Sequence, residues 1–348
     1  MSKIFITGAS GYIGGQALYQ ITQDFPNAQI TLLERLQEEA DKIQLQYRSV
    51  KLVIAGLDDA AIIEHEAEQA DIVLNLADAK HIAGAQSIHN GLKRRSVNSP
   101  VFWVQISGAA LLATAETANK EYQPGSSSET VFDDTDGIAA LRDHIRQYPG
   151  RAIDNYLQSV SSTSPHVHSA LLTPPIIYGK GDGPVNQRST QVPELISATL
   201  KRGKALQLGN GLNKWGNIHI RDLGTLISGF VDKAIGKDLS KDIWGDNGVY
   251  LASVGELSFG EIAQKIALAA KEQSYIGDTS VDSLVAADFQ TEGKGFIPLL
   301  FGTNARSRSH RATKYLDWKP TSHNLEQEIK QCVAREAEAL GLQKLATV

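Results

Sequence analysis

The first 35 residues limit the fold more than any other part of the chain. A short apolar run at 3–7 leads into the segment Thr7-Gly8-Ala9-Ser10-Gly11-Tyr12-Ile13-Gly14, and a helix-like pattern follows. Glycines in this arrangement allow a tight turn, a close approach of the backbone to a phosphate, and close packing of the helix on the strand. The free N–H groups at the start of such a helix attract an anion. We therefore predict that this turn binds the pyrophosphate of a nicotinamide dinucleotide, with contacts from Gly8, Ser10, Gly11, Tyr12, Ile13 and Gly14.

An acidic residue is expected at the end of the second strand, about 20 residues after the glycines. Glu34 stands there, directly before Arg35. A carboxylate accepts hydrogen bonds from the ribose hydroxyls of NAD and repels the 2′-phosphate of NADP, whereas a guanidinium suits that phosphate. Glu34 therefore favours NAD, which we expect as the cofactor, and Arg35 leaves NADP as the alternative.

Short apolar runs alternate with helix-length segments through the first half of the chain, which indicates βαβ units and a parallel sheet. The expected strands are 3–7, 29–33, 51–54, 71–76, 102–106 and 168–173. Helical periodicity returns at 192–203, 255–271 and 323–340, and the stretch 118–137 has the composition of a surface loop. We predict an α/β fold, namely a Rossmann-type doubly wound parallel sheet with a smaller C-terminal substrate lobe. Residues 1–180 and 217–252 would form the dinucleotide-binding domain, and residues 181–216 and 253–348 the second lobe.

Composition excludes several classes of protein. The formal net charge of the 348 residues is −5, which gives no electrostatic footprint for nucleic acid or for an anionic membrane surface. Cys332 is the one cysteine, so an internal disulfide and a metal cluster of cysteines are both excluded, and no metal is expected. The chain shows no secretory signal and no apolar run of the ~18 residues that a membrane span needs. A cytoplasmic protein is expected.

Several short motifs follow one another in an order that resembles a known family. The glycines are spaced Gly-x-x-Gly-x-x-Gly, and Pro174-Pro175-Ile176-Ile177-Tyr178-Gly179, His219-Ile220-Arg221-Asp222 and Leu316-Asp317-Trp318-Lys319-Pro320 lie further along. This series resembles the short-chain dehydrogenase/reductase superfamily, in its extended branch of NAD-dependent sugar-nucleotide epimerases and dehydratases. The resemblance covers nearly the whole chain. It implies further cofactor contacts at Leu57, Asp58, Leu76, Ala77, Pro174 and Ile176.

The catalytic motif of that family is degraded here. The family uses a serine after the fifth strand and a Tyr-x-x-x-Lys pair on the next helix, in which tyrosine moves the proton and lysine lowers its pKa. The two Tyr-x-x-x-Lys strings of this chain, at 47–51 and 315–319, lie in the wrong places and are coincidences. Alignment backwards from Pro174-Pro175 places Gln147 near the tyrosine position and Arg151 near the lysine position.

The nearest tyrosine to that position is Tyr148, and the following Pro149-Gly150 is predicted to interrupt a helix. After the fifth strand, Ser107 is present, but Gly108 stands where the family has its second, catalytic serine. His81 in the loop after the fourth strand and Tyr178 beside the nicotinamide pocket are further candidates. The catalytic candidates are therefore Tyr148, Arg151, Ser107, Tyr178 and His81.

Three other features have weaker functional interpretations. The basic run from Arg306 to Arg311 is suited either to an anionic substrate group or to a solvated surface. Trp215 is suited equally to the core and to a substrate wall, and His144 and His219 are weaker candidates of the same kind.

The leading interpretation is an NAD(P)-dependent oxidoreductase or epimerase/dehydratase-like enzyme that acts on a small carbonyl or hydroxyl compound. The alternative is a redox-sensing regulator that holds the dinucleotide without turning it over, which the degraded catalytic pair would suit. A small-molecule substrate is expected as partner, and the resemblance also implies a homodimer.

Overall fold

A seven-stranded parallel sheet forms the centre of the computed structural model, which describes residues 1–292 and 298–346. Its strand order is β11-β7-β5-β4-β1-β2-β3. The strands are β1 (Lys3–Thr7), β2 (Gln29–Glu34), β3 (Lys51–Ile54), β4 (Ile72–Asn75), β5 (Val101–Ile106), β7 (Val167–Thr173) and β11 (Val249–Leu251). The chain runs outward from β1 in both directions, so the turn after β1 lies at the switch point where ligands bind in such sheets. The predicted Rossmann-type fold is confirmed.

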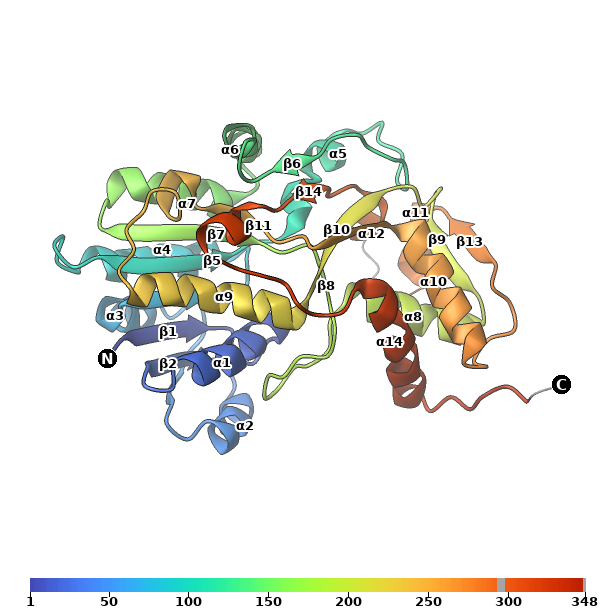
Figure 1. The fold of residues 1–348 in the computed structure, drawn as a ribbon, viewed down its shortest axis with the longest axis horizontal. Coiled ribbons are helices and arrows are strands. Elements are labelled where there is room, and N and C mark those ends of the chain that lie inside the picture. The colour runs from blue at the N-terminus through green and yellow to red at the C-terminus, as the bar shows by residue number, and fades with distance from the viewer. Residues whose placement is uncertain (293–297, 347–348) are drawn as a thin grey trace.

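Helices cover both faces of the sheet (Figure 1). One face carries α1 (Tyr12–Asp24), α2 (Gln37–Gln46) and α9 (Ile220–Ile235), and the other carries α3 (Ala60–Gln69), α4 (Ile82–Lys93) and α7 (Ala152–Thr163). Side chains alternate along the strands, so Ile4 and Ile6 join one hydrophobic core while Phe5 joins the other. Because both faces are covered, the strands appear in the sequence as continuous apolar runs.

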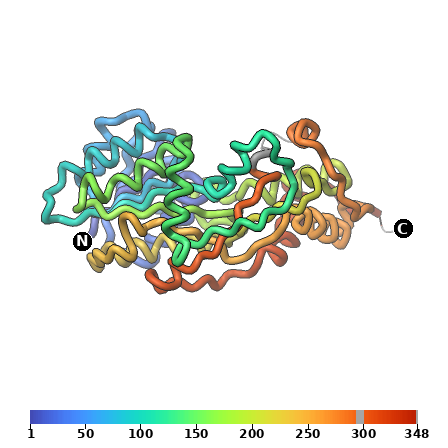
Figure 2. Tube along the Cα trace, turned by 90° about the horizontal axis from the view of Figure 1, so that it is seen from above, coloured from blue at the N-terminus to red at the C-terminus, as the bar shows by residue number. Residues whose placement is uncertain are grey.

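The second lobe lies beside the carboxyl edge of the sheet (Figures 1 and 2). It contains α8 (Gln191–Arg202), α10 (Phe259–Glu272) and α14 (Leu325–Ala339), with α11 (Ala286–Thr291), α12 (Pro298–Gly302) and the parallel pair β9 (Ala205–Leu208) and β13 (Val281–Leu284). A three-stranded sheet of β8 (Ile176–Tyr178), β10 (Lys214–His219) and β12 (Gly255–Ser258) connects it to the first lobe. No helix in the described part of the chain is long and apolar enough to cross a bilayer.

Two segments differ from their sequence-based descriptions. The segment 255–271 begins as strand β12, antiparallel to β10, and the helix starts only at Phe259 after a capping box made by Ser258 and Glu261.

The stretch 118–137 is a surface segment that is fixed in place. Its short strand β6 (Phe132–Asp133) pairs with β14 (Ser307–Arg308), and the next residue, Asp134, is fully buried. The Asp134 carboxylate accepts backbone N–H bonds from Leu251, His310 and Arg311.

Candidate active site

The glycine turn has the shape that a pyrophosphate needs. Gly8 has a φ of +79°, and a Cβ on it would lie 2.8 Å from the backbone of Ala77. A Cβ on Gly14 would lie 2.0 Å from the carbonyl oxygen of Gly8, so the helix packs directly on the turn. Within the described residues, a Cβ on Gly11 would meet only that same oxygen, at 3.1 Å. Gly11 caps α1 without a side chain, and this leaves the groove in front of the helix open to an anion.

One end of this groove is a hollow of about 520 Å³ that begins beneath the turn. Its lining includes the predicted cofactor residues Gly8, Ser10, Gly11, Glu34, Arg35, Leu57, Asp58, Leu76 and Ala77. Glu34 is buried, and its Oε1 accepts a hydrogen bond from the backbone N–H of Ser10 at 3.0 Å. Burial raises the pKa of Glu34, and the hydrogen bonds from Ser10 oppose that rise. Arg35 lies exposed at the rim. This hollow has the size and the polar groups for an adenosine.

The other end of the groove is a hollow of about 270 Å³ that shares Gly11 and Leu76 with the first. It is also lined by Tyr12, Ile13, Pro175, Ile177, Ser189, Thr190 and Gln191. The predicted contacts Pro174 and Ile176 do not line it; their neighbours Pro175 and Ile177 do. Side chains alternate along β8, so Ile176 is directed into the core while Ile177 faces the hollow.

Ser107 and Arg151 meet at the carboxyl edge of the sheet, although 44 positions separate them. Arg151 donates from Nη2 to the Ser107 hydroxyl at 2.8 Å and from Nε to Asp154 Oδ2 at 2.5 Å. The Ala109 N–H donates to the Pro174 carbonyl at 2.9 Å, which connects this corner to the residue before Pro175, although neither Ser107 nor Arg151 lines the smaller hollow. Asp154 was not a sequence-based candidate, since an isolated aspartate on a helix carries no motif.

Tyr148 ends one helix and Arg151 precedes the next. The helix α6 (Ile138–Gln147) stops before Tyr148, and α7 starts after Arg151, so the predicted break at Pro149-Gly150 is confirmed. The Tyr148 ring packs on His144, with 5.0 Å between ring centroids. Its backbone carbonyl accepts a hydrogen bond from the Arg151 N–H at 3.0 Å. Tyr148 therefore lies close to Arg151 in a turn, and the two side chains do not share a helical face.

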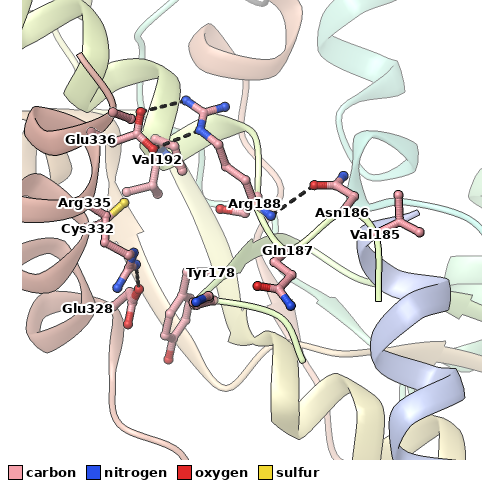
Figure 3. Close-up of a pocket in the computed structure, with 15 residues that line it drawn as sticks. Tyr178, Val185, Asn186, Gln187, Arg188, Val192, Glu328, Cys332, Arg335 and Glu336 are labelled. Atoms are coloured by element: carbon pink, nitrogen blue, oxygen red, sulfur yellow. Dashed lines mark hydrogen bonds and ion pairs between the residues drawn. The ribbon is translucent and has the colours of Figure 1, made fainter. Parts of the chain in front are cut away.

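The other two catalytic candidates lie away from this corner. His81 caps α4, with Nδ1 accepting from the Gly84 N–H and Nε2 3.0 Å from Asp58 Oδ1, and it lines the adenosine hollow. Tyr178 lines a separate cavity of about 390 Å³ between the loop 179–190 and α14 (Figure 3). Its hydroxyl donates to the His323 carbonyl at 2.8 Å, and Tyr178 does not line the smaller hollow, which is the one nearer the expected nicotinamide position.

The remaining candidates have structural partners. Arg306 forms an ion pair with Glu256, and Arg311 is buried against the carbonyls of Asp134 and Asp242. Trp215 is buried and donates to the Thr303 carbonyl.

His219, His323 and Glu328 bring three potential metal ligands within 4.8 Å of one another. One nitrogen of each imidazole already has a hydrogen-bond partner. The Arg221 N–H donates to His219 Nδ1, and His323 Nε2 lies 2.6 Å from Glu328.

The comparisons with known proteins decide the family. The sequence profile of the NAD dependent epimerase/dehydratase family matches residues 4–239. The chain belongs to that family. The predicted extended short-chain dehydrogenase/reductase type is therefore confirmed, and the protein is an NAD(P)-dependent enzyme of the oxidoreductase and epimerase type.

Relatives match this family member along nearly its whole length. An oxidase from Acremonium sp is 32% identical and covers 98% of this chain and 99% of its own. An uncharacterized protein from Saccharomyces cerevisiae is 24% identical over 94% of this chain and 98% of its own.

Solved structures with this fold include a dTDP-glucose 4,6-dehydratase from Bacillus anthracis in complex with NAD, with a TM-score of 0.64, 15% identity and 97% coverage of both chains. A UDP-glucuronic acid 4-epimerase from Bacillus cereus, also with NAD, has a TM-score of 0.66 at 13% identity and covers 97% of this chain and 99% of its own.

Proposed function

We propose that this enzyme oxidises or reduces a small carbonyl or hydroxyl compound with NAD. The observation that carries the proposal is the contact of Ser107 with Arg151 at the carboxyl edge of the sheet. Among the described residues, a Cβ on Gly108 would meet no atom within 4 Å, so space for a substrate lies next to Ser107. A polar corner beside free space suits the oxygen of a carbonyl or carbinol.

The groove fits the dinucleotide along its length. Gly8, Gly11 and Gly14 shape the pyrophosphate cradle, and the two hollows that meet at Gly11 would take the adenosine and the nicotinamide. The bound NAD accepts or delivers a hydride at its nicotinamide ring. The buried carboxylate of Glu34 would accept a ribose hydroxyl and would repel a 2′-phosphate, which supports NAD over NADP.

Arg151 does a different task from the lysine of the family. A guanidinium stays charged at all working pH values, so Arg151 cannot exchange a proton during turnover. Its Nη2–H donates to Ser107 and fixes the hydroxyl rotamer, which leaves the Ser107 oxygen with one remaining lone pair for a substrate O–H. Ser107 and Arg151 would thus orient the substrate oxygen. For the proton donor, the sequence offers Tyr148, Tyr178 and His81 as alternatives.

A redox-sensing regulator is the second candidate, because Gln147 and Arg151 stand where the family has tyrosine and lysine. Spectrophotometry with NADH, NADPH and a panel of small aldehydes and ketones separates the two functions. The enzyme should bleach NADH absorbance with at least one carbonyl compound and should prefer NADH to NADPH. Tight NADH binding by calorimetry without turnover on any compound would support the regulator instead.

The homodimer that the resemblance implies stays a prediction, which light scattering of the purified protein would test.

A further inference from the structure

A buried carboxylate lies behind Ser107 and Arg151. Asp154 is 2% exposed, and its Oδ2 accepts the Arg151 Nε–H at 2.5 Å. Its Oδ1 is buried and has no hydrogen-bond partner among the described residues. An unpaired buried carboxylate oxygen costs free energy, and its presence calls for an explanation such as a catalytic role or a bound water. The free oxygen is therefore an acceptor that the fold itself does not use.

Few charged groups act on the Asp154 carboxyl. The Ser107 hydroxyl and the Arg151 guanidinium both lower the pKa of Asp154, but desolvation by burial is larger and the net shift is upward. The helices and strands packed on α7 carry other titratable or charged groups. These are Arg142, Asp143, His144 and Arg146 on α6, His89 and Lys93 on α4, His166 and His168 at β7, and Asp246 in the turn before β11. Arg142 is paired with Asp246, and among the described residues it is the charge of Arg151 that lowers the pKa of Asp154.

Space exists on both sides of this carboxylate. Gly108 leaves room for a substrate beside Ser107, as described above. On the other side, Asp154 borders a void of about 10 Å³ together with Leu157, Ser169 and Gly248. A void of this size is close to that of a single water molecule. Asp154 therefore lies between the substrate corner and a position where one water could exchange a proton with it.

We propose that Asp154 stores the proton of the redox step and exchanges it with the substrate oxygen through the hydroxyl of Ser107. The inference rests on the redox function proposed above and identifies its proton acceptor. In the oxidation direction, the substrate O–H bond breaks as its proton passes to Ser107 Oγ, and the proton of Ser107 passes to the Asp154 carboxylate. The electron pair of the substrate C–H bond leaves with its hydrogen as hydride to oxidised NAD, which leaves a C=O bond. Asp154 acts through Ser107 and is a positioning residue that also holds the proton.

The geometry favours this route over Tyr148. Ser107 touches the guanidinium that Asp154 holds, whereas the Tyr148 ring packs on His144, and its hydroxyl has no hydrogen bond to any part of the chain that the structure describes. The family's tyrosine is missing from its position, and the buried Ser107–Arg151–Asp154 cluster supplies a hydroxyl, a cation and a base at the same corner.

Infrared titration of the cofactor-free protein tests whether Asp154 can hold a proton. We expect a buried carboxyl that titrates well above about 4, the range of an ordinary aspartate, and that is missing in Asp154→Asn. Ser107→Ala should raise that midpoint further, because it removes a donor to the charged form. Asp143→Asn, in an exposed aspartate on α6, should leave the band unchanged. A midpoint for Asp154 at or below about 4 would overturn the proposal.

The pH profile of turnover tests the relay. With the carbonyl compound that bleaches NADH best, the wild-type rate should fall as pH rises through the Asp154 midpoint, because reduction needs the protonated acid. Asp154→Asn should lose this pH dependence and at least about a hundredfold in kcat, while calorimetry shows unchanged NADH binding. Tyr148→Phe should keep the profile and lose less than about threefold. Survival of the profile in Asp154→Asn, with its loss in Tyr148→Phe, would overturn the relay and leave the redox function intact. Failure of wild type to oxidise NADH with any compound would instead overturn the redox function, and the relay with it.

Discussion

Single residues decide whether the groove accepts a dinucleotide, and Gly11 is the sharpest example. Its missing side chain opens both hollows, and among the residues that the structure describes a Cβ there would touch only the Gly8 oxygen. Gly11→Val should therefore fold normally and lose at least about a hundredfold in NAD affinity, roughly 2.7 kcal/mol. Titration calorimetry measures the loss. Gly277→Val is the matched control, because Gly277 is exposed and a Cβ on it meets nothing within 4 Å in the described structure. NAD affinity that stays at the wild-type level in Gly11→Val would contradict the groove assignment.

The choice between the two cofactors also depends on adjacent residues. Glu34→Gln keeps a hydrogen-bond acceptor near Ser10 but removes the charge that repels a 2′-phosphate, so the ratio of NAD to NADP affinity should fall. Arg35→Gln should raise that ratio, because it removes the exposed cation at the rim. We expect changes of about tenfold in each direction, or ~1.4 kcal/mol. Competition binding with both cofactors measures the ratio, and a wild type that already prefers NADP would show that Glu34 does not exclude the phosphate.

The sequence could predict which of the site residues follow a motif, and it could not predict Asp154. Gly8, Gly11, Gly14 and Glu34 lie in one continuous stretch with a known spacing, so their grouping follows from local order. The role proposed for Asp154 depends on Ser107, which follows strand β5 far away in the sequence, and on burial that no local pattern records. The contacts predicted at Pro174 and Ile176 are one residue away from Pro175 and Ile177, which line the hollow, and the cause is similar. In a strand buried on both faces, the pairing with neighbouring strands sets the face toward which each side chain points.

Among the elements, the loop 179–190 connects the two halves of the site. Tyr12 donates to the Gly179 carbonyl at 2.7 Å, and the Asn186 N–H donates to the Ser10 carbonyl at 3.2 Å. At its other end, Arg188 donates twice to Glu336 on α14, at 2.9 Å each. The last two residues of the loop, Ser189 and Thr190, line the smaller hollow, which we propose for the nicotinamide. One segment therefore holds the glycine turn, the hollow and the second lobe in register.

Breaking the Arg188–Glu336 pair should loosen this loop without unfolding the protein. Arg188 is half exposed, so the pair contributes at most about 1 kcal/mol. In Glu336→Gln, amide exchange over 179–190 should accelerate by no more than about fivefold, with the unfolding temperature nearly unchanged. Hydrogen-exchange mass spectrometry measures this, and Glu38→Gln, which breaks an exposed pair on α2, is the control. Exchange that stays as slow as in wild type would show that the contacts with α1 alone hold the loop.

At the scale of the whole molecule, the sequence predicts the first lobe far better than the second. Six parallel strands of the first lobe are the apolar runs expected from the sequence, whereas the edge strand β11, which pairs with β7, was not predicted. The second lobe is built from excursions of the chain. Its pairs β9–β13 and β10–β12 join segments far apart in sequence, and the strand β12 is directly continuous with a helix. A strand as short as β12 is too short to show the two-residue hydrophobic alternation of a strand. The helical pattern of the following residues therefore includes it in the sequence-based prediction.

The stability of the whole molecule should depend on pH through a buried histidine that joins three elements. His89 on α4 lies 2.7 Å from the Tyr156 hydroxyl on α7 and 3.0 Å from the Ser164 hydroxyl, and its ring lies beside Trp103 of β5. It is 3% exposed, and burial lowers its pKa from 6.5 to about 4. The folded protein therefore binds this proton less well than the unfolded chain, so stability is complete above pH ~6.5 and falls as pH drops towards ~4.

The loss attributable to His89 should reach about 3 kcal/mol across that interval, since each unit of pKa shift corresponds to ~1.4 kcal/mol. In His89→Gln, the free energy of unfolding in urea should be lower than in wild type at pH 7 but should decline less between pH 6.5 and 4. His65→Gln is the control, because His65 is exposed on α3 and should not change the profile. Parallel pH profiles for wild type and His89→Gln would mean that the proton enters elsewhere. The other histidines with lowered pKa values, His144, His168 and His219, would then contribute to the acid sensitivity, because burial lowers the pKa of each of them.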